Sequence, residues 1–504
     1  MISPIDPLAS SLPLLLKAWL LAPFLGAFLA ALLPSLARGL LLVSSLATAL
    51  VGISQLLGSP AVELELLGSH GVALSIDQLS GWFLLLNALV LSAVLLDGWA
   101  TPQTVPQRML LLVLQGGLNV AFVATDLVSL YVTLELVGIT AFLLIVLPQR
   151  QATLWVGLRY LLVGNTAMSL YLIGAALVYV QQQSFRLEAL VDLSFGAPQV
   201  FLLIGLFTKA GLFAAGLWLP RTHAEAPAQV SALLSGVVVA AGVAPLLRLA
   251  ELDPLLLSSI RWVGGAGAVL GVIYALAAGD SKRLLAWSTL SQMGLIVLSP
   301  LSGGALALAH GLAKGGLFLS VRHLPSRQLA QWRTHSMPLA TQACLWIGSL
   351  SIAGLPPLAG FAAKKQLAAE LPSPWSSFAL LVSIGTVAVY AQFWPLLLQP
   401  SDIRQAAPAV PFSEQLAGSL LMLPLVAGGL LAAGEGVSWS GAASTALVLA
   451  AGLLLRRLLD GIRRNAPQLC RSLALPDIEG LQQLLGGIVV LGAGLLATVN
   501  WNLD

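Results

Sequence analysis

Long runs of apolar residues alternate with short polar segments along nearly the whole chain of 504 residues. A transmembrane helix needs about 20 consecutive apolar residues to cross the hydrocarbon core of a bilayer. Sixteen candidate spans have this pattern: residues 13–34, 38–57, 78–96, 107–124, 126–147, 153–181, 198–219, 228–250, 256–278, 284–300, 302–321, 338–363, 376–399, 414–433, 440–458 and 480–500. The pattern predicts an all-α polytopic membrane protein with 14–16 transmembrane helices. The number is fourteen if the two segments after residue 434 lie on the membrane surface.

The composition supports this class. Hydrophobic residues make up 58% of the chain and charged residues 9%, whereas charged residues are about 25% of a typical soluble domain. The formal net charge is +3, but the basic residues are scattered over short loops, so we expect no nucleic-acid partner. Cys344 and Cys470 lie far apart without the spacing of metal ligands, which argues against a disulfide framework and a cysteine-based metal site.

Basic residues are concentrated in alternate loops. With the loops between the sixteen spans numbered in order, the even-numbered loops contain only Arg186, Arg248 and Arg261. The odd-numbered loops contain Arg38, Arg108, Arg150, Arg221, Lys282, Arg283, Arg322, Arg327, Arg333, Arg404, Arg456, Arg457, Arg463, Arg464 and Arg471. Short cytoplasmic loops carry an excess of lysine and arginine, so we expect both termini on the non-cytoplasmic side.

An isolated lysine interrupts the seventh span. Lys209 has about eight apolar or small residues on each side, a depth at which an ammonium group costs roughly 2.5–3.5 kcal/mol. Gly211 and Gly216 loosen the helix beside it, and Pro220 and Pro227 interrupt it. Freed backbone groups inside a membrane must face protein or water, so a titratable amine beside a helix break is typical of a transport site. A lysine that reaches the membrane surface is the alternative.

A second break is expected in the twelfth span, where Gly354, Pro356 and Pro357 precede Lys364 and Lys365. Two interrupted spans that are five apart are expected of two five-helix repeats with a broken helix at the same place in each. The predicted organisation is helices 1–3 in residues 1–106, a first repeat in 107–250, a second repeat in 256–399 and C-terminal helices in 400–504.

One carboxylate lies deep in a span. Glu135 is near the middle of the fifth span, with Asp126 at its mouth. A lone buried carboxylate and a lone buried lysine each favour the neutral form, so we expect Glu135 to pair with Lys209, because each stabilises the charge of the other. A static ion pair that only joins two helices is the alternative.

His310 and Lys314 are four residues apart, which places them on one face of a helix. Imidazole titrates near neutral pH, so two such groups within one helical turn are able to pass a proton along. A packing role for His310 is the alternative.

These residues lie in blocks that resemble the antiporter-like subunits shared by respiratory complex I, its photosynthetic relatives and Mrp-type cation/proton antiporters. The block of Lys209 continues through Trp-Leu-Pro (218–220) and His223 to Val-Ser-Ala-Leu-Leu-Ser-Gly (230–236). Four further blocks are similar to that family and follow in its order: Asp-Leu-Val-Ser-Leu-Tyr-Val-Thr-Leu-Glu (126–135), Asp-Ser-Lys-Arg-Leu-Leu-Ala-Trp-Ser-Thr-Leu-Ser-Gln-Met-Gly (280–294), His310 with Lys314, and Gly-Leu-Pro-Pro-Leu-Ala-Gly-Phe-Ala-Ala-Lys (354–364).

The resemblance implies a core of fourteen helices with inverted five-helix repeats and a chain of buried charges along the membrane midplane. Glu135 and Lys209 correspond to the family's glutamate–lysine pair, Lys314 to its central lysine and Lys364 to its terminal charged residue. We expect these residues and His310 to carry ions, with Asp126, His223 and Lys365 as accessory groups.

The chain departs from the family pattern at two positions. Ala240 stands where many members carry a lysine or histidine in the eighth helix, and Leu306 stands where a second histidine often precedes His310. Water must then bridge the gap between Lys209 and His310, unless the eighth helix is a dry packed core.

The expected function is translocation of protons, or exchange of Na⁺ for protons, by a subunit of an Mrp-type antiporter complex. The alternatives are a proton-pumping subunit of a complex I-like NAD(P)H– or ferredoxin–quinone oxidoreductase, a transporter of small solutes, and a degenerate structural subunit. We expect no catalytic centre, cofactor or metal site within the chain. The expected partners are other membrane subunits and the lipid of a bacterial inner or plasma membrane, or of a thylakoid.

Overall fold

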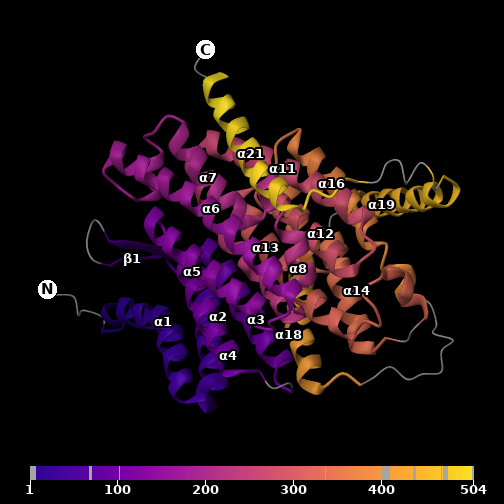
Figure 1. Ribbon diagram of the computed structural model, residues 1–504, viewed down its shortest axis with the longest axis horizontal. Helices are drawn as coiled ribbons and strands as arrows, with labels where there is room; N and C mark the ends of the chain where they lie inside the picture. Colours follow the sequence, from indigo (N-terminus) through magenta and orange to yellow (C-terminus); the bar gives the residue numbers. More distant parts are fainter. Residues whose placement is uncertain are drawn as a thin grey trace.

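The computed structural model describes residues 7–66, 71–100, 103–334, 337–398, 409–434, 439–466, 468 and 475–501. Three residues named above for the charge of the loops or the spacing of the cysteines lie outside this part of the chain: Arg404, Cys470 and Arg471. The described residues are mostly helical and form one bundle, with the N-terminal helices on one side and the C-terminal half on the other (Figure 1).

The first half of the chain contains one hairpin of strands between its second and third helices. Its elements are α1 (Pro7–Leu32), η1 (Pro34–Leu36), α2 (Ala37–Leu56), β1 (Val62–Leu66), β2 (Val72–Ile76), α3 (Gln78–Asp97), α4 (Val105–Val123), α5 (Leu127–Val146), α6 (Gln151–Gln182), η3 (Leu187–Leu190), α7 (Ala197–Ala210), η4 (Phe213–Gly216), α8 (Leu219–Glu225), α9 (Ala228–Leu233), η5 (Leu234–Val238) and α10 (Ala240–Leu252). β1 pairs with β2 antiparallel, with Val62 opposite Ile76.

The second half is helical wherever it has regular structure. Its elements are α11 (Pro254–Ala277), α12 (Ser281–Ile296), α13 (Pro300–Ser320), η6 (Val321–His323), η7 (Leu329–Thr334), α14 (Leu339–Ala353), α15 (Ala359–Glu370), α16 (Trp375–Tyr390), α17 (Trp394–Leu397), α18 (Phe412–Gly434), α19 (Trp439–Asn465) and α21 (Leu481–Trp501). Helix α13 lies in the interior and contacts α3, α9, α12, α14, α15 and α18.

Each of the sixteen predicted spans overlaps a helix. Ten helices among the described residues are long and apolar enough to cross a membrane, and the pair formed by α7 and the segment Phe213–Glu225, bent by 44°, makes an eleventh if it is one span. The predicted class, an all-α polytopic membrane protein, is therefore confirmed, whereas the exact number of spans stays a prediction.

Both predicted helix breaks are present and have the same local geometry. Gly211 ends α7 with a φ of +68°, and Gly354 ends α14 with a φ of +82°. In each case the next residue donates its backbone N–H five positions back, from Leu212 to Phe207 at 2.9 Å and from Leu355 to Leu350 at 3.0 Å. Glycine adopts this left-handed conformation without the steric cost of a Cβ. The five-helix repeats and the four-part division of the chain stay predictions.

A third irregularity was not predicted. The segment η5, which contains Ser235 and Gly236, is a π-helical turn between α9 and α10. Such turns insert an extra residue into a helix and often lie at functional sites. The eighth span is thus irregular at its centre, directly after the broken seventh span.

Glycines allow close packing of the central helices. A Cβ at Gly271 of α11 would lie 2.5 Å from the backbone nitrogen of Ser291 in α12, and a Cβ at Gly267 would lie 2.8 Å from that of Phe213. Small residues that let backbones approach are typical of helix contacts in membranes. Gly267 and Gly271 are therefore packing positions of α11.

Contacts between the described loops fall into two sets. In the first set, which we call the even-loop face, Arg248 bonds Asp77 at 2.6 Å and Ser299 bonds Glu370 at 2.7 Å. Burial opposes ionisation of Asp77, but the hydrogen bond and charge of Arg248 hold its pKa below the ordinary value.

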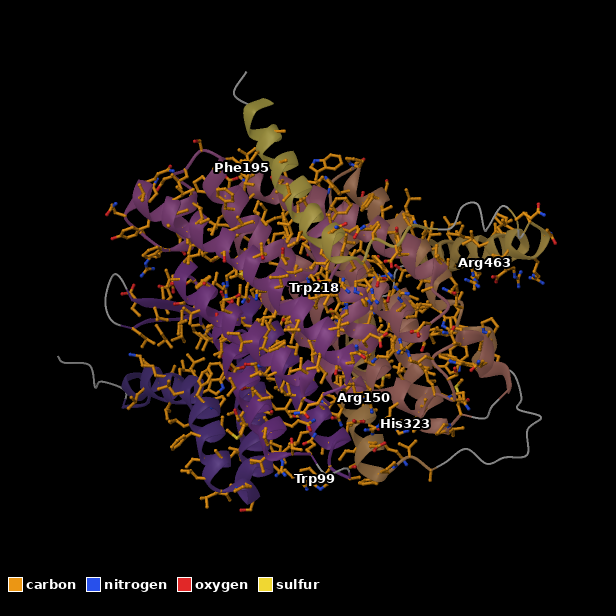
Figure 2. All side chains as sticks on the ribbon, viewed as in Figure 1. Trp99, Arg150, Phe195, Trp218, His323 and Arg463 are labelled. Carbon is orange, nitrogen blue, oxygen red and sulfur yellow. The ribbon has the colours of Figure 1, made fainter. Side chains whose placement is uncertain are left out.

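The second set, the odd-loop face, joins the odd-numbered loops to one another. Arg322 bonds Asp97 at 3.1 Å, and Arg283 bonds Glu479 at 2.7 Å. In Figure 2, the labels of Trp99, Arg150, His323 and Arg463 lie in the lower and right-hand part of the view, Phe195 of an even-numbered loop lies at the upper left, and Trp218 lies between them. This separation agrees with a chain whose loops alternate between two sides of a membrane.

Candidate functional site

Lys209 lies in the last turn of α7, directly before the break at Gly211. Its Nζ is 3.1 Å from Oε1 of Glu135 on α5, so the predicted ion pair is present. The same Nζ donates to the backbone oxygen of Leu134 at 3.1 Å. An ammonium group buried in a bundle is stabilised when a carboxylate and a carbonyl oxygen accept its protons.

The surroundings of this pair leave it little space. Oriented with its amide nitrogen toward α5, Asn165 donates to Oε2 of Glu135 at 3.1 Å, an orientation assigned from the hydrogen bonds that it allows. A Cβ at Gly138 would lie 2.7 Å from Nζ of Lys209, so a larger residue there would displace the end of the lysine side chain. The adjoining cavity has a volume of about 10 Å³, which is close to the least that holds one water molecule.

Lys314 lies on α13 and is fully buried. Its Nζ donates to the backbone oxygen of Leu285 at 2.5 Å and to the hydroxyl of Ser288. The Ser288 hydroxyl in turn lies 2.9 Å from the hydroxyl of Tyr390 on α16. Among the described residues no carboxylate forms an ion pair with Lys314, unlike Lys209.

Hydroxyl groups extend from Lys314 toward the π-helical turn. Thr289 donates to the same Leu285 oxygen at 3.0 Å, and its hydroxyl lies 2.7 Å from that of Ser235 in η5. Ala240, where the family pattern has a lysine or histidine, is only 2% exposed. The neighbouring Ala241 lines the small cavity of Lys209. Side-chain hydroxyls thus reach from Lys314 into the eighth span, where the sequence offers no titratable group.

His310 and Lys314 are both buried on α13. In the part of the chain that the structure describes, neither ring nitrogen of His310 has a hydrogen-bond partner. The charges of Lys314 and Lys364 are close enough to act on the imidazole. His310 is therefore within electrostatic reach of both lysines of the second half, and its place in the order of transfer stays a prediction.

Lys364 lies beside the second helix break. Its Nζ donates to the backbone oxygen of Ile352 at 2.7 Å, a carbonyl in the last turn of α14. Lys364, Lys365 and Ser383 line a cavity of about 110 Å³, which has room for several water molecules. Next to the break, Lys364 therefore has both a backbone acceptor and a cavity large enough for water.

The remaining accessory residues lie apart from this series. Asp126 caps α5 by accepting from the backbone of Ser129 at 2.7 Å, and it also accepts from the backbone of Ala73 at 3.0 Å, so its contacts are structural. His223 in α8 is buried between the rings of Trp218 and Phe318, with centroids 5.9 Å away on each side. It adjoins the break after Lys209 without bonding to Lys209.

Sequence reasoning missed several polar partners: Asn165, Ser235, Ser288, Thr289 and Tyr390. Ser288 and Thr289 lie within a block that is quoted above for its resemblance. Adjacent hydroxyl groups inside an apolar span need hydrogen-bond acceptors in the membrane. Their presence in the sequence could therefore have indicated a polar contact at this place. Asn165 and Tyr390 had no comparable signal, because their roles depend on which helices face α5 and α12.

The chain matches a protein-family model described as "NADH:quinone oxidoreductase/Mrp antiporter, TM" over residues 124–389. Hydrogenase-4 component B of Escherichia coli is 33% identical over 302 residues, covering 52% of this chain and 43% of that protein. NADH-quinone oxidoreductase subunit N of Desulforudis audaxviator is 31% identical over 339 residues, covering 59% and 66%. The matched regions therefore span less than two thirds of the length of each of these two relatives.

A solved structure of the Mrp complex from Dietzia contains a chain with a similar fold. The TM-score is 0.75 with 23% sequence identity, and the match covers 95% of this chain and 59% of that chain. At this identity the similarity extends to the fold alone, which is the fold of a subunit in a multi-subunit membrane complex.

Proposed function

Because the chain belongs to the NADH:quinone oxidoreductase/Mrp antiporter family of membrane proteins, we propose that it carries protons across a membrane as one subunit of a larger complex. The observation that carries the proposal is a series of amines inside the bundle, of which two are partly buried at the helix breaks and one is fully buried on the helix between them. Lys209 and Lys364 adjoin the breaks, and Lys314 lies on the interior helix α13. Buried charges are costly in a membrane and mark ion pathways.

The proposed mechanism is a stepwise shift of protonation along this series. Lys209 holds a proton while Glu135 stabilises its ammonium form, and it releases the proton when the charge around Glu135 changes. The proton then reaches Lys314, with the hydroxyls of Ser235 and Thr289 lining part of the way. His310 and Lys364 complete the series toward the cavity at the second break.

The gap between Lys209 and Ser235 has little space for water. The cavity beside Lys209 is close in volume to a single water molecule, and the residues of η5 are buried. Transfer across this gap therefore requires a transient widening that admits water. The π-helical turn offers such a movement, because its extra residue is inserted into an otherwise regular helix.

Two kinds of complex are candidates. The Mrp-type antiporter expected from the sequence has support from the fold shared with the Dietzia complex, and in that complex Na⁺ would be the exchanged ion. A redox-driven complex has support from relatives named hydrogenase-4 component B and NADH-quinone oxidoreductase subunit N. In both, this subunit contributes the proton path and not the energy source.

The test is to purify the complex from its native membrane through a tag on this chain and to reconstitute it in liposomes with an internal pH dye. Proton movement driven by an imposed Na⁺ gradient, with small antiporter subunits copurifying, supports the first candidate. Movement driven by an electron donor, with iron–sulfur subunits copurifying, supports the second. A reconstituted complex that moves no protons under either condition contradicts the proposed function.

A further inference from the structure

A second group of buried charges lies at the odd-loop face, where the ends of α3, α13 and α18 meet. Arg322 of η6 bonds Oδ1 of Asp97 at 3.1 Å and Oε1 of Glu414 at 2.6 Å through the same nitrogen. Nε2 of His323 lies 2.8 Å from the other oxygen of Glu414. The two carboxylates are almost fully buried, with side-chain exposures of 3% and 5%.

The charges of this group do not balance without a mobile proton. Among the described residues, its two carboxylates, Asp97 and Glu414, form ion pairs with one permanent cation, Arg322. The other neighbour of Asp97 is neutral, since Gln229 of α9 donates to Oδ2 at 2.7 Å. The group becomes neutral only when His323 or one carboxylate binds a proton. The imidazole of His323, 2.8 Å from Glu414, is able to exchange such a proton.

A cavity of about 180 Å³ opens beside this group. Asp97, His323 and Glu414 form its polar wall, and Thr341 and Cys344 of α14 line it from another side. The volume has room for several water molecules, and the wall supplies the polar partners that such waters need. A proton on this group is therefore able to exchange with water in the cavity.

The inner wall of the cavity leads toward Lys314. Ser320 lines the cavity and follows Lys314 by six residues on α13, a rise of about 9 Å along the helix. Gly315 and Gly316 lie between them, and a Cβ at Gly316 would collide with the thioether of Met422 on α18. Met422 also lines the cavity. Two side chains of α18 therefore fill the space that these glycines leave: Leu421 lies over Gly315, and the flexible Met422 lies over Gly316, next to the cavity.

We infer that Asp97, Arg322, His323 and Glu414 form a proton-binding access site that connects the odd-loop face with Lys314, with Met422 as its gate. The inference rests on the proposed function, since it gives the central lysine its own route to one side of the membrane. It predicts that the second half of the chain exchanges protons with that side without passing Lys209.

The first test concerns water access and does not depend on transport. In a Cys470→Ser background, Cys344 is the remaining cysteine, and a membrane-impermeant thiol reagent is applied to sealed vesicles of each orientation. We expect Cys344 to react from the same side as a cysteine at Ser326, and from the side opposite to one at Glu63 on β1. Reaction only from the side of Glu63, or only after solubilisation in denaturant, would overturn the access site.

The second test measures proton flux of the reconstituted complex as a function of pH on the odd-loop side. We expect Glu414→Gln to lower the flux about tenfold or more and to flatten its pH dependence, and Glu414→Asp to restore both. Glu63→Gln, an exposed change on the opposite face, is the matched control and should leave flux and pH profile unchanged. If Glu414→Gln fails to assemble, His323→Gln is measured instead, with the same flattened profile expected.

The outcomes separate this inference from the proposed function. A wild-type complex without proton flux contradicts the function itself. Wild-type flux together with an unchanged rate and pH profile in the assembled Glu414→Gln or His323→Gln complex overturns the access site alone.

Discussion

Lys209 and Lys314 both lie inside the same bundle, but Lys209 is partly buried and Lys314 fully buried, and their partners differ. Lys209 lies 3.1 Å from the carboxylate of Glu135. Lys314 bonds a backbone oxygen and a serine hydroxyl, and no carboxylate pairs with it in the part of the chain that the structure describes. The first half of the chain therefore holds a paired charge, whereas the second half holds an amine with neutral partners.

These different partners allow one chain both to keep and to release a proton. A carboxylate partner stabilises the ammonium form strongly, while neutral acceptors stabilise it less, because only the carboxylate carries an opposing charge. Lys209 is thus suited to hold a proton until Glu135 changes its interactions, and Lys314 is suited to pass a proton on. Four variants that alter these lysines, their partners or the segment between them test this contrast.

Glu135→Gln should have the largest effect on assembly. It removes the only described carboxylate that forms an ion pair with Lys209 and leaves the ammonium buried without an opposing charge, which costs about 3–5 kcal/mol. We expect less assembled complex and a lower midpoint of thermal unfolding in detergent. The double variant Glu135→Gln/Lys209→Met should recover assembly without proton flux. A single variant as stable as the wild type would show that the pair is not the important contact of Lys209.

Ala240→Lys places a third lysine between the two regions, where the side chain is 2% exposed. If the eighth helix is as dry as the small cavity beside it suggests, inserting the amine costs roughly 2.5–3.5 kcal/mol, and the yield of complex should fall. Ala278→Lys in the loop after α11, a position that is only partly buried, serves as the comparison. Normal assembly of Ala240→Lys with sustained flux would instead indicate a hydrated path through α10.

Lys314→Met should affect transport far more than assembly. No opposing charge is stranded, and the lost hydrogen bonds to Leu285 and Ser288 cost about 1–3 kcal/mol. We expect a complex of nearly normal yield that carries no protons, as measured with the internal pH dye. Loss of assembly comparable to that of Glu135→Gln would mean that the two lysines do not differ as proposed.

Thr289→Val should have the smallest effect on stability. It keeps the side-chain shape and removes one hydroxyl between Ser235 and Leu285, at a cost of about 1 kcal/mol. We expect a flux that is several-fold lower with unchanged assembly. Thr166→Val is the control, because its hydroxyl also bonds a backbone oxygen of its own helix but lies at an exposed position. Equal flux in both variants would show that the hydroxyl of Thr289 is not part of the proton path.

The helix breaks and their lysines were predictable because they stand out locally. A glycine or proline beside a lysine in an apolar span departs from its surroundings, and the structure has breaks at Gly211 and Gly354. The partner of Lys209 was also predictable, since Glu135 is the one carboxylate deep in a nearby span. Each of these features can be recognised from the sequence of a single helix.

The rest depended on which distant segments meet. Asp97 and Glu414 are separated by more than three hundred residues in the sequence, and each appears there only as an acid at the end of a span. Their grouping around Arg322 arises because α18 packs against α3 and α13. The π-helical turn likewise follows from packing, as the apolar pattern of residues 228–250 is that of a regular helix.

The most direct test of the proposed function is proton flux in the Lys209→Ala complex, measured in liposomes beside the wild type and the Lys17→Ala control. Lys17 is a lysine of α1, remote in sequence from both breaks. The account predicts no coupled proton flux from the Lys209→Ala complex that assembles, compared with the wild type at equal amounts of protein, and wild-type flux in the control. Full flux in the assembled Lys209→Ala complex would contradict it.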